Sequence, residues 1–156
     1  MIGSVACYVS RHVICLPGTI PNLPEILVTD HVEPYFDFFF DRLAGPNGIS
    51  KQQRENYVHA YSRPEALHTG FEWYRAFPRD KENNLQVKGE IVDVPVLYLR
   101  GDHESGDIKN YLRGFREAGL RNLRGQMIPN SGHFGPDEQP DEVRKALCAF
   151  VGIPFC

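Results

Sequence analysis

Apolar residues recur at helical spacing in the first part of the chain after residue 22. The stretch 25–45 is rich in aromatic residues, and Pro34 within it predicts a break or a new helix start. The glycine, proline and asparagine residues at 45–48 predict where this helical stretch stops. A further helix from about residue 62 has one apolar stripe with a repeat of three or four residues. The stripe consists of Leu67, Phe71, Tyr74 and Phe77.

Two capping signals predict where helices begin in this region. Ser50 and Gln53 have the spacing of a capping box, so we expect a helix from there to about residue 61. Ser62 and Glu65 repeat that spacing, with a proline in the predicted first turn. A polar loop is expected over residues 78–91. Residues 23–80 are therefore predicted to form a small all-helical domain, and residues 81–156 a second domain.

The pattern changes from helical to alternating strand and helix in the second domain. The run VPVLYLRG, residues 94–101, predicts a strand that is buried on both faces of a parallel sheet. A helix over about 105–119, a short strand within 123–132 and a helix over 139–152 follow. In the last helix the residues predicted to face inward are Val143, Ala146, Leu147 and Phe150. This order predicts an α/β fold with a right-handed parallel crossover.

Composition narrows the classes of function without identifying one. The 156 residues are 42% hydrophobic and 24% charged, with a formal net charge of −3, which is typical of a globular protein. No basic field predicts binding to nucleic acid, and no apolar run predicts a membrane span. The four cysteines, Cys7, Cys15, Cys148 and Cys156, favour reduced thiols in a cytoplasmic protein. Residues 1–22, which could contain a strand, have no assigned role.

Two loops are predicted to meet at the carboxyl edge of the sheet, where ligands bind in parallel sheets. The first, RGDHESGD, carries carboxylates, and the second, NSGHFG, carries His133 between glycines. An acid one strand away from a histidine can orient its imidazole ring. A metal site within the first loop is the weaker alternative, because adjacent residues on a turn rarely converge on one ion. No cofactor is expected. Glu138, Asp141 and Glu142 are most simply favourable charges at a helix start.

At this point the chain resembles the α/β-hydrolases, in the branch of the epoxide hydrolases and the haloalkane or fluoroacetate dehalogenases. VPVLYLRGDHE and MIPNSGHFGPDEQPDEVRKALCAFV resemble the last strands, histidine loop and final helix of that family. YFDFFFDRL and GFEWYRAF resemble helices of its cap domain. The resemblance covers about residues 23–152. It implies a helical cap followed by the last two parallel strand–helix units of the hydrolase core, with an incomplete core sheet.

The resemblance also implies site residues. In this family an aspartate opens the epoxide or displaces a halide to form an alkyl–enzyme ester, which a histidine-activated water then hydrolyses. By this resemblance, His133 would be the water-activating base and Tyr74 would donate a hydrogen bond to the epoxide oxygen. Glu104 would be the acid that orients His133, with Asp102 as the alternative. The implied substrate is a small apolar or epoxide-type molecule.

One part of the family pattern is missing from this sequence. Residues 1–30 contain no small-x-nucleophile-x-small elbow, and the chain has no oxyanion loop of the HG type. We therefore expect a truncated hydrolase that is inactive alone and that recruits a completing chain, or a second copy, through its open sheet edge. The alternative is a non-catalytic remnant that binds an apolar ligand or a partner protein. Its expected pocket is lined by Phe38, Phe39, Trp73 and Tyr74.

Overall fold

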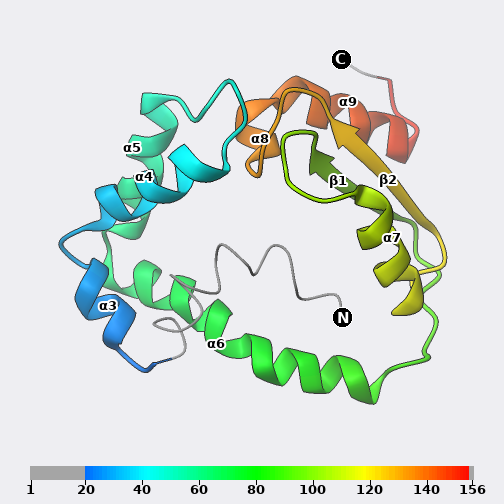
Figure 1. Cartoon of the computed structure of the whole chain (residues 1–156), viewed down its shortest axis with the longest axis horizontal. Helices are drawn as coiled ribbons and strands as arrows, with labels where there is room; N and C mark the ends of the chain where they lie inside the picture. The colour runs from blue at the N-terminus through cyan, green and yellow to red at the C-terminus, as the bar shows by residue number, and fades with distance from the viewer. Residues whose placement is uncertain (1–19, 155–156) are drawn as a thin grey trace. The chain divides into compact units, whose positions relative to one another are not determined.

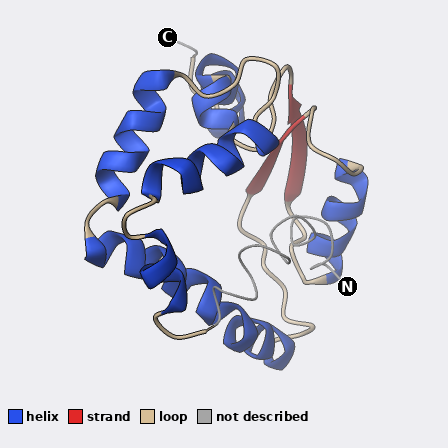
Figure 2. Ribbon diagram, turned by 60° about the vertical axis from the view of Figure 1, so that its left-hand side comes forward, coloured by secondary structure: helices blue, strands red, loops and turns tan. Residues whose placement is uncertain are grey.

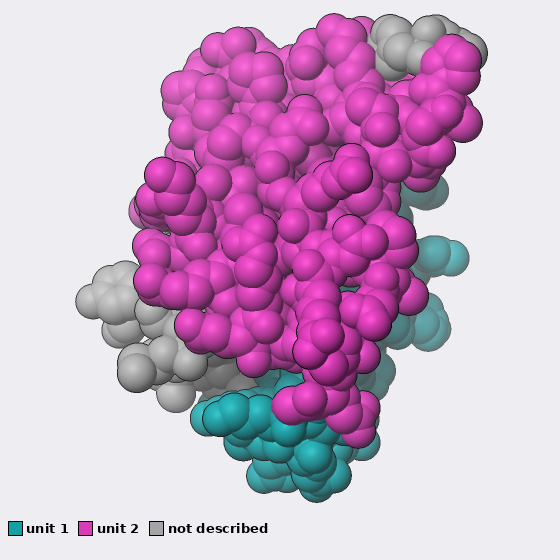
Figure 3. Space-filling model, turned by 90° about the vertical axis from the view of Figure 1, so that its right-hand side faces the viewer, with its two compact units in different colours: residues 1–38, 50–88 teal, residues 39–49, 89–156 magenta. Residues whose placement is uncertain are grey.

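A computed structural model describes residues 20–154. The chain divides into two compact units, which Figure 3 colours separately. The helical unit comprises residues 1–38 and 50–88, and the sheet unit comprises residues 39–49 and 89–156. The segment 1–19 and residues 155–156, with Cys7, Cys15 and Cys156, lie outside the described residues. Cys148 is a free thiol.

The helical unit begins with α3 (Leu23–Val28) and the first part of α4 (Val32–Leu43), as Figure 1 shows. Pro34 lies in the first turn of α4, so the predicted new helix start is confirmed. The helix α5 (Lys51–Tyr61) begins with the predicted capping box. Gln53 donates its backbone N–H to the Ser50 hydroxyl, and Ser50 donates its own N–H to the Gln53 side chain.

The long helix α6 (Pro64–Gln86) differs from its prediction at both ends. Arg63, not Ser62, is its N-cap, because the Ser62 hydroxyl instead donates to the Val58 carbonyl at the end of α5. The polar loop predicted from residue 78 is wrong, since the helix continues through Pro78 to residue 86. Pro78 removes one backbone donor, but the side chains after it stay exposed to water, and several of them, such as Lys81 and Glu82, favour a helix.

Apolar side chains from three helices form the core of the helical unit. Val28 and Val32 pack with Leu67 and Phe71, and each of the four is at most 6% exposed. Half-buried residues surround this group: Tyr35, Phe36, Val58 and Tyr61. The predicted stripe of α6 is therefore buried at its first two positions, while Phe77 is 49% exposed.

The sheet unit contains two parallel strands joined through a helix (Figure 2). The order is β1 (Val96–Gly101), α7 (Ile108–Glu117), β2 (Leu123–Ile128), α8 (Gly135–Glu138) and α9 (Pro140–Val151). The strands pair in register from Val96 with Leu123 to Gly101 with Ile128. The predicted order of strands and helices and the parallel pairing are thus confirmed. The chain is an α/β structure with a helical part and a small parallel sheet.

Burial of the strands is lower than the sequence predicts. Val94 is 62% exposed, the first four residues of β1 are only half-buried, and Met127 on β2 is 37% exposed. The reason is that β1 and β2 are the whole sheet in the part of the chain that is described, so each strand has one unpaired edge. On α9, Ala146 is buried as predicted, but Leu147 is 48% exposed, which corrects its predicted inward position. No helix within residues 20–154 has the length and apolar character required to cross a membrane.

Candidate active site

The two predicted loops meet at the carboxyl ends of β1 and β2. Backbone hydrogen bonds join them: Asp102 N–H donates to the Ile128 carbonyl over 3.1 Å, and His103 N–H to the Ser131 carbonyl over 2.9 Å. The Asp102 carboxylate in turn accepts the Ser131 N–H at 3.1 Å. Ser131 is completely buried. The parallel register therefore places the acidic loop directly beside the histidine loop.

A buried carboxylate fixes the histidine loop on both sides of His133. Glu138, on α8, is 7% exposed and accepts the N–H groups of Gly132 and Phe134, each at 2.9 Å. It also accepts the Gly45 N–H at 2.5 Å. Charge-assisted bonds of this kind are about twice as strong as neutral ones. The expectation that Glu138 is only a favourable charge at a helix start is therefore wrong, because it is the anchor of the loop.

Close backbone packing makes three glycines necessary around this anchor. A Cβ at Gly101 would collide with the carbonyl oxygens of Gly132 and Ser131. A Cβ at Gly132 would collide with the Leu43 carbonyl, and one at Gly45 would lie 2.6 Å from the Gly132 nitrogen. His133 donates its own backbone N–H to the Leu43 carbonyl at 2.8 Å. The end of α4 thus holds His133 from one side while β1 holds its loop from the other.

The side chain of His133 faces Glu104. Its Nδ1 lies 3.4 Å from Glu104 Oε2, which is a long hydrogen bond, and the His133 side chain is 52% exposed. With the proton on Nδ1, the ring donates to the carboxylate and Nε2 is left as a base. This is the orientation that a general base requires. The ring also packs edge to face on Phe134, with centroids 5.3 Å apart.

Glu104 is held in its ionised form by its surroundings. Burial alone would raise the pKa of its carboxyl, but the hydrogen bond with His133 and the charge of Arg100 together lower it below the ordinary value. Arg100 Nη1 lies 3.5 Å from Glu104 Oε2, and Glu104 Oε1 accepts the Gly101 N–H at 3.3 Å. A carboxylate that stays charged can stabilise the imidazolium that forms when His133 accepts a proton.

Asp102, the alternative acid, bonds to other groups. Its carboxylate binds the Ser131 backbone and lies 3.8 Å from His103 Nε2. Burial would raise its pKa, but the backbone N–H groups of Asn130 and Ser131 outweigh that effect and lower it. The structure therefore brings Glu104, and not Asp102, to His133. In the structure, an acid of the first loop, Glu104, thus lies within hydrogen-bonding distance of the histidine of the second loop.

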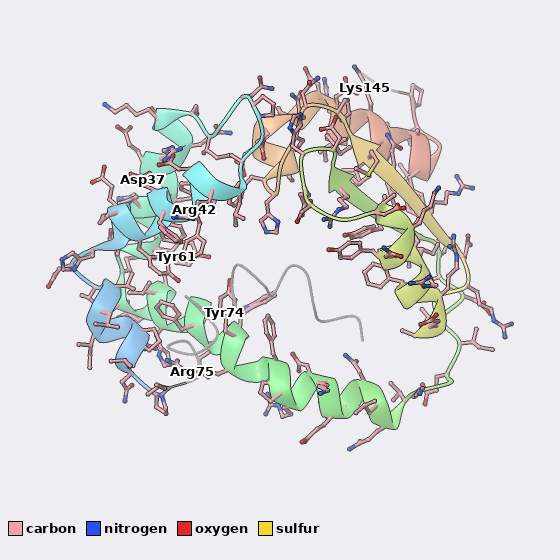
Figure 4. The ribbon with its side chains drawn as sticks, in the orientation of Figure 1. Asp37, Arg42, Tyr61, Tyr74, Arg75 and Lys145 are labelled. Atoms are coloured by element: carbon pink, nitrogen blue, oxygen red, sulfur yellow. The ribbon has the colours of Figure 1, made fainter. Side chains whose placement is uncertain are left out.

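Tyr74 lies on α6 in the helical unit, where Figure 4 labels it beside Arg75. Its ring packs edge to face with that of Phe77, with centroids 5.4 Å apart. Burial, reinforced by the neighbouring Tyr74, raises the pKa of the Tyr35 phenol. Of the residues expected to line an apolar pocket, Trp73 is 72% exposed. A hollow in the helical unit runs along α6 and includes Trp73, Arg75 and Phe77 in its lining.

Two residues of the site were missed by the sequence analysis. Arg100 is an arginine within an otherwise apolar strand, and a buried charge needs partners, so its position was a usable signal. Glu138 gave a weaker signal, because an acidic residue at a helix start is common without any such role. No group of metal-ligating side chains occurs in the described part of the chain, and so the loop alternative of a metal site has no support there.

The chain is similar in sequence to known epoxide hydrolases, although no family model matches it. A soluble epoxide hydrolase from Corynebacterium sp. strain C12 is 30% identical over 129 residues, which are 81% of this chain and 44% of the relative. Epoxide hydrolase A from Mycobacterium tuberculosis is 31% identical over 121 residues, or 74% of this chain and 37% of the relative.

The fold is also shared with solved structures. The structure of a Nostoc sp. PCC 7120 protein assigned to the alpha/beta hydrolases matches with a TM-score of 0.80 and 26% identity. The match covers 96% of this chain and 52% of that one. The chain is a relative of the epoxide hydrolases in the α/β-hydrolase superfamily. It spans less than half the length of the two curated relatives.

Proposed function

We propose that this chain carries the water-activating part of an epoxide hydrolase site, with His133 as the base and Glu104 as the acid that orients it. The observation that carries the proposal is the 3.4 Å approach of His133 Nδ1 to Glu104 Oε2. The buried Glu138 carboxylate supports it, because its bonds to the N–H groups of Gly132 and Phe134 fix the backbone on both sides of His133. General-base catalysis needs a base that is held in a fixed position.

The proposed reaction has two steps. In the first, a carboxylate oxygen of an aspartate forms a bond to an epoxide carbon, the epoxide C–O bond breaks, and the released oxygen takes a proton. In the second, His133 Nε2 removes a proton from water as the water oxygen attacks the ester carbonyl. The ester C–O bond to the aspartate carbonyl then breaks, and the leaving oxygen takes the proton of the carboxylic acid that forms, which releases a diol and restores the carboxylate. The proton on His133 returns to the donor of the first step. Glu104 stabilises the imidazolium during this second step.

Tyr74 is the proposed donor to the epoxide oxygen in the first step. Its support is the resemblance of GFEWYRAF to a cap helix, together with its partly buried position on α6. A phenol is a suitable donor there because it is neutral at physiological pH and can return its proton. Replacement by phenylalanine would keep the packing against Phe77 and remove only the hydroxyl.

The aspartate is proposed to come from a sheet segment outside this chain. The open edges of the two-stranded sheet support this, since unpaired strand edges bind further strands. The candidate source is a sheet segment that carries the nucleophile elbow, which a second copy of these 156 residues would not supply. We also propose the cytoplasm as the location, on the basis of the free Cys148 thiol.

The test compares the purified chain with a fusion protein. In the fusion, residues 23–156 replace the segment of the Corynebacterium epoxide hydrolase that this chain matches, so that the relative supplies the nucleophile. We expect no hydrolysis of styrene oxide by the chain alone and clear hydrolysis by the fusion. The mass of the chain in solution is recorded beside its His133→Ala variant. Hydrolysis by the chain alone that is lost in His133→Ala would contradict the external nucleophile, and an inactive but folded fusion would contradict the function.

A second candidate function is the binding of an apolar ligand without turnover. The exposed Trp73 and Phe77 on α6 favour it, because large aromatic surfaces in contact with water often mark binding sites. Trp73 is the sole tryptophan of the 156 residues, so its fluorescence reports on that surface alone. Saturable quenching by hexanol or 1-naphthol that is unchanged in His133→Ala, together with an inactive fusion, would favour binding over catalysis.

A further inference from the structure

Arg100 is a buried cation on the strand that leads into the acidic loop. Its side chain is 5% exposed, and burial of a charge is costly unless partners compensate it. Within residues 20–154, the carboxylate that pairs with it is that of Glu104, with Nη1 3.5 Å from Oε2. The same oxygen, Oε2, faces His133 Nδ1 at 3.4 Å. One carboxylate oxygen is therefore shared between a permanent cation and the imidazole.

Further contacts hold the guanidinium rigidly in this position. Nη2 donates to the Ser105 carbonyl in the acidic loop, and Nη1 donates to the Tyr98 hydroxyl over 3.2 Å. The guanidinium carbon lies 4.2 Å from the centre of the Tyr111 ring, which itself stacks with Tyr98. A planar guanidinium uses such a set of bonds and ring contacts better than an ammonium can. Arg100 thus connects β1, α7 and the loop that carries Glu104.

We propose that Arg100 is a positioning residue that holds the Glu104 carboxylate toward His133 and limits how strongly this carboxylate favours the protonated imidazole. The inference rests on the proposed function, because it concerns the same pair of side chains. A carboxylate bound to His133 alone would favour the charged form of the imidazole, which cannot act as a base, more strongly than a carboxylate shared with a cation does. By sharing Oε2, Arg100 weakens that preference while the carboxylate stays oriented toward Nδ1 of the ring.

The other charged groups around the pair are occupied elsewhere. Asp102 and His103 face each other at 3.8 Å in the acidic loop. Glu138, on α8, accepts backbone N–H groups on both sides of His133. From β1, Arg100 is the cation that reaches Glu104. The effect assigned to Arg100 is therefore separable by substitution from those of its neighbours.

The test measures the imidazole of His133 directly and requires no enzymatic activity. The full chain is labelled with 15N on histidine, and the His133 resonance is assigned by its loss in His133→Gln. Titration by NMR then gives the pKa of the His133 imidazole in Arg100→Met, Glu104→Gln and the double variant. Arg113→Met is the matched control, because Arg113 lies on α7 with a side chain that is 70% exposed and faces Glu117.

We expect Arg100→Met to raise the pKa of the His133 imidazole by about 0.5 to 1, and Glu104→Gln to lower it by a similar amount. In the Glu104→Gln background the same Arg100 substitution should change this pKa by less than half as much. An Arg100→Met change no larger than that of Arg113→Met would overturn the proposal. So would an equal change with and without Glu104.

A conservative variant keeps the test decisive if Arg100→Met does not fold. Arg100→Lys keeps the charge near Glu104, so the pKa of the His133 imidazole should stay close to that of the unchanged protein. A drop or rise as large as that of Glu104→Gln would overturn the proposal. The result is independent of the hydrolysis assay. An inactive fusion with the expected titrations would reject the proposed function and keep the pairing of Arg100 with Glu104. An active fusion without the expected titrations would reject only the role of Arg100.

Discussion

The core of the helical unit and the edge of the sheet around His133 are held together by opposite kinds of interaction. In the helical unit, apolar side chains such as Val28, Leu67 and Phe71 form the buried centre. At the sheet edge the buried groups are polar: Arg100, Ser131 and Glu138 are each at most 7% exposed. The first arrangement tolerates many apolar sequences, while the second requires particular atoms at particular distances.

This difference explains why the two regions respond differently to change. An apolar core loses stability in proportion to the volume removed. A buried polar network instead fails when one partner is lost, because the remaining groups stay buried without bonds. We therefore expect substitutions in the two regions to lower the free energy of unfolding by similar amounts. Only those at the sheet edge should also disturb the position of His133.

The largest effect is expected from Gly101→Ala. The new Cβ would collide with two backbone carbonyl oxygens of the histidine loop, which cannot move without breaking the bonds to Glu138. We predict a loss of at least about 3 kcal/mol in the free energy of unfolding, measured with urea. The control is Gly48→Ala, where a Cβ meets nothing within 4 Å and only the positive φ of 63° is unfavourable. Equal losses at the two glycines would contradict the close packing.

Leu67→Ala tests the apolar core of the helical unit. Leu67 is 4% exposed in the apolar core, so truncation should cost about 2 to 4 kcal/mol. Amide hydrogen exchange should become faster in α3 and α6, while the chemical shifts of Gly132, His133 and Phe134 stay unchanged. Shifts in the histidine loop as large as those in α6 would show that the two regions are not independent in this way.

Glu138→Gln tests the polar region with a substitution of the same shape. The amide has one acceptor oxygen where the carboxylate has two. At least one of the three N–H groups that Glu138 binds would therefore face an NH2 group, which cannot accept a hydrogen bond. We predict a loss of about 2 kcal/mol and faster exchange of the Gly45, Gly132 and Phe134 amides. Asp141→Asn, a neighbouring exposed acid on α9, should change stability by no more than about 0.5 kcal/mol.

The smallest effect is a pH dependence in the helical unit. Hydrogen bonds from Arg75, at 2.8 and 2.9 Å, lower the pKa of Glu25 from 4.5 to about 2, although burial opposes this. A depressed pKa in the folded state means that this contribution to stability is complete above about pH 4.5 and is lost as the pH falls toward 2. Thermal unfolding at pH 6 and pH 3 should show a smaller pH dependence in Glu25→Gln than in the unchanged protein. An identical dependence in both would contradict the role of Glu25.

The sequence predicted most of the features that depend on local patterns. The helix start near Pro34, the capping box at Ser50 and the order of strands and helices that implies parallel pairing are all present. It failed where long-range polar contacts decide the outcome. The role of Glu138 depends on Gly45, which is 93 positions away in the chain, and no local pattern predicts that contact.

The helix boundaries show a second limit of sequence patterns. Ser62 has the spacing of a cap, but its hydroxyl bonds to the preceding helix. The signal therefore predicted that a helix begins here, but it named the wrong residue as the N-cap, which is Arg63. A polar loop was predicted from residue 78, yet α6 continues through Pro78 to Gln86, because a polar stretch is also compatible with an exposed helix. Burial of β1 was overestimated because a strand sequence does not state how many neighbours pair with it.

The most direct test of the proposed site compares two neighbouring histidines in the fusion protein. His133→Ala and His103→Ala remove side chains that are similarly exposed, on adjacent loops. Intact-mass spectrometry after addition of styrene oxide should show a covalent adduct of one substrate that accumulates in His133→Ala, because the ester forms but no base activates water. His103→Ala should turn over without such an adduct. Full hydrolysis by His133→Ala, with no adduct, would contradict the assignment of His133 as the base.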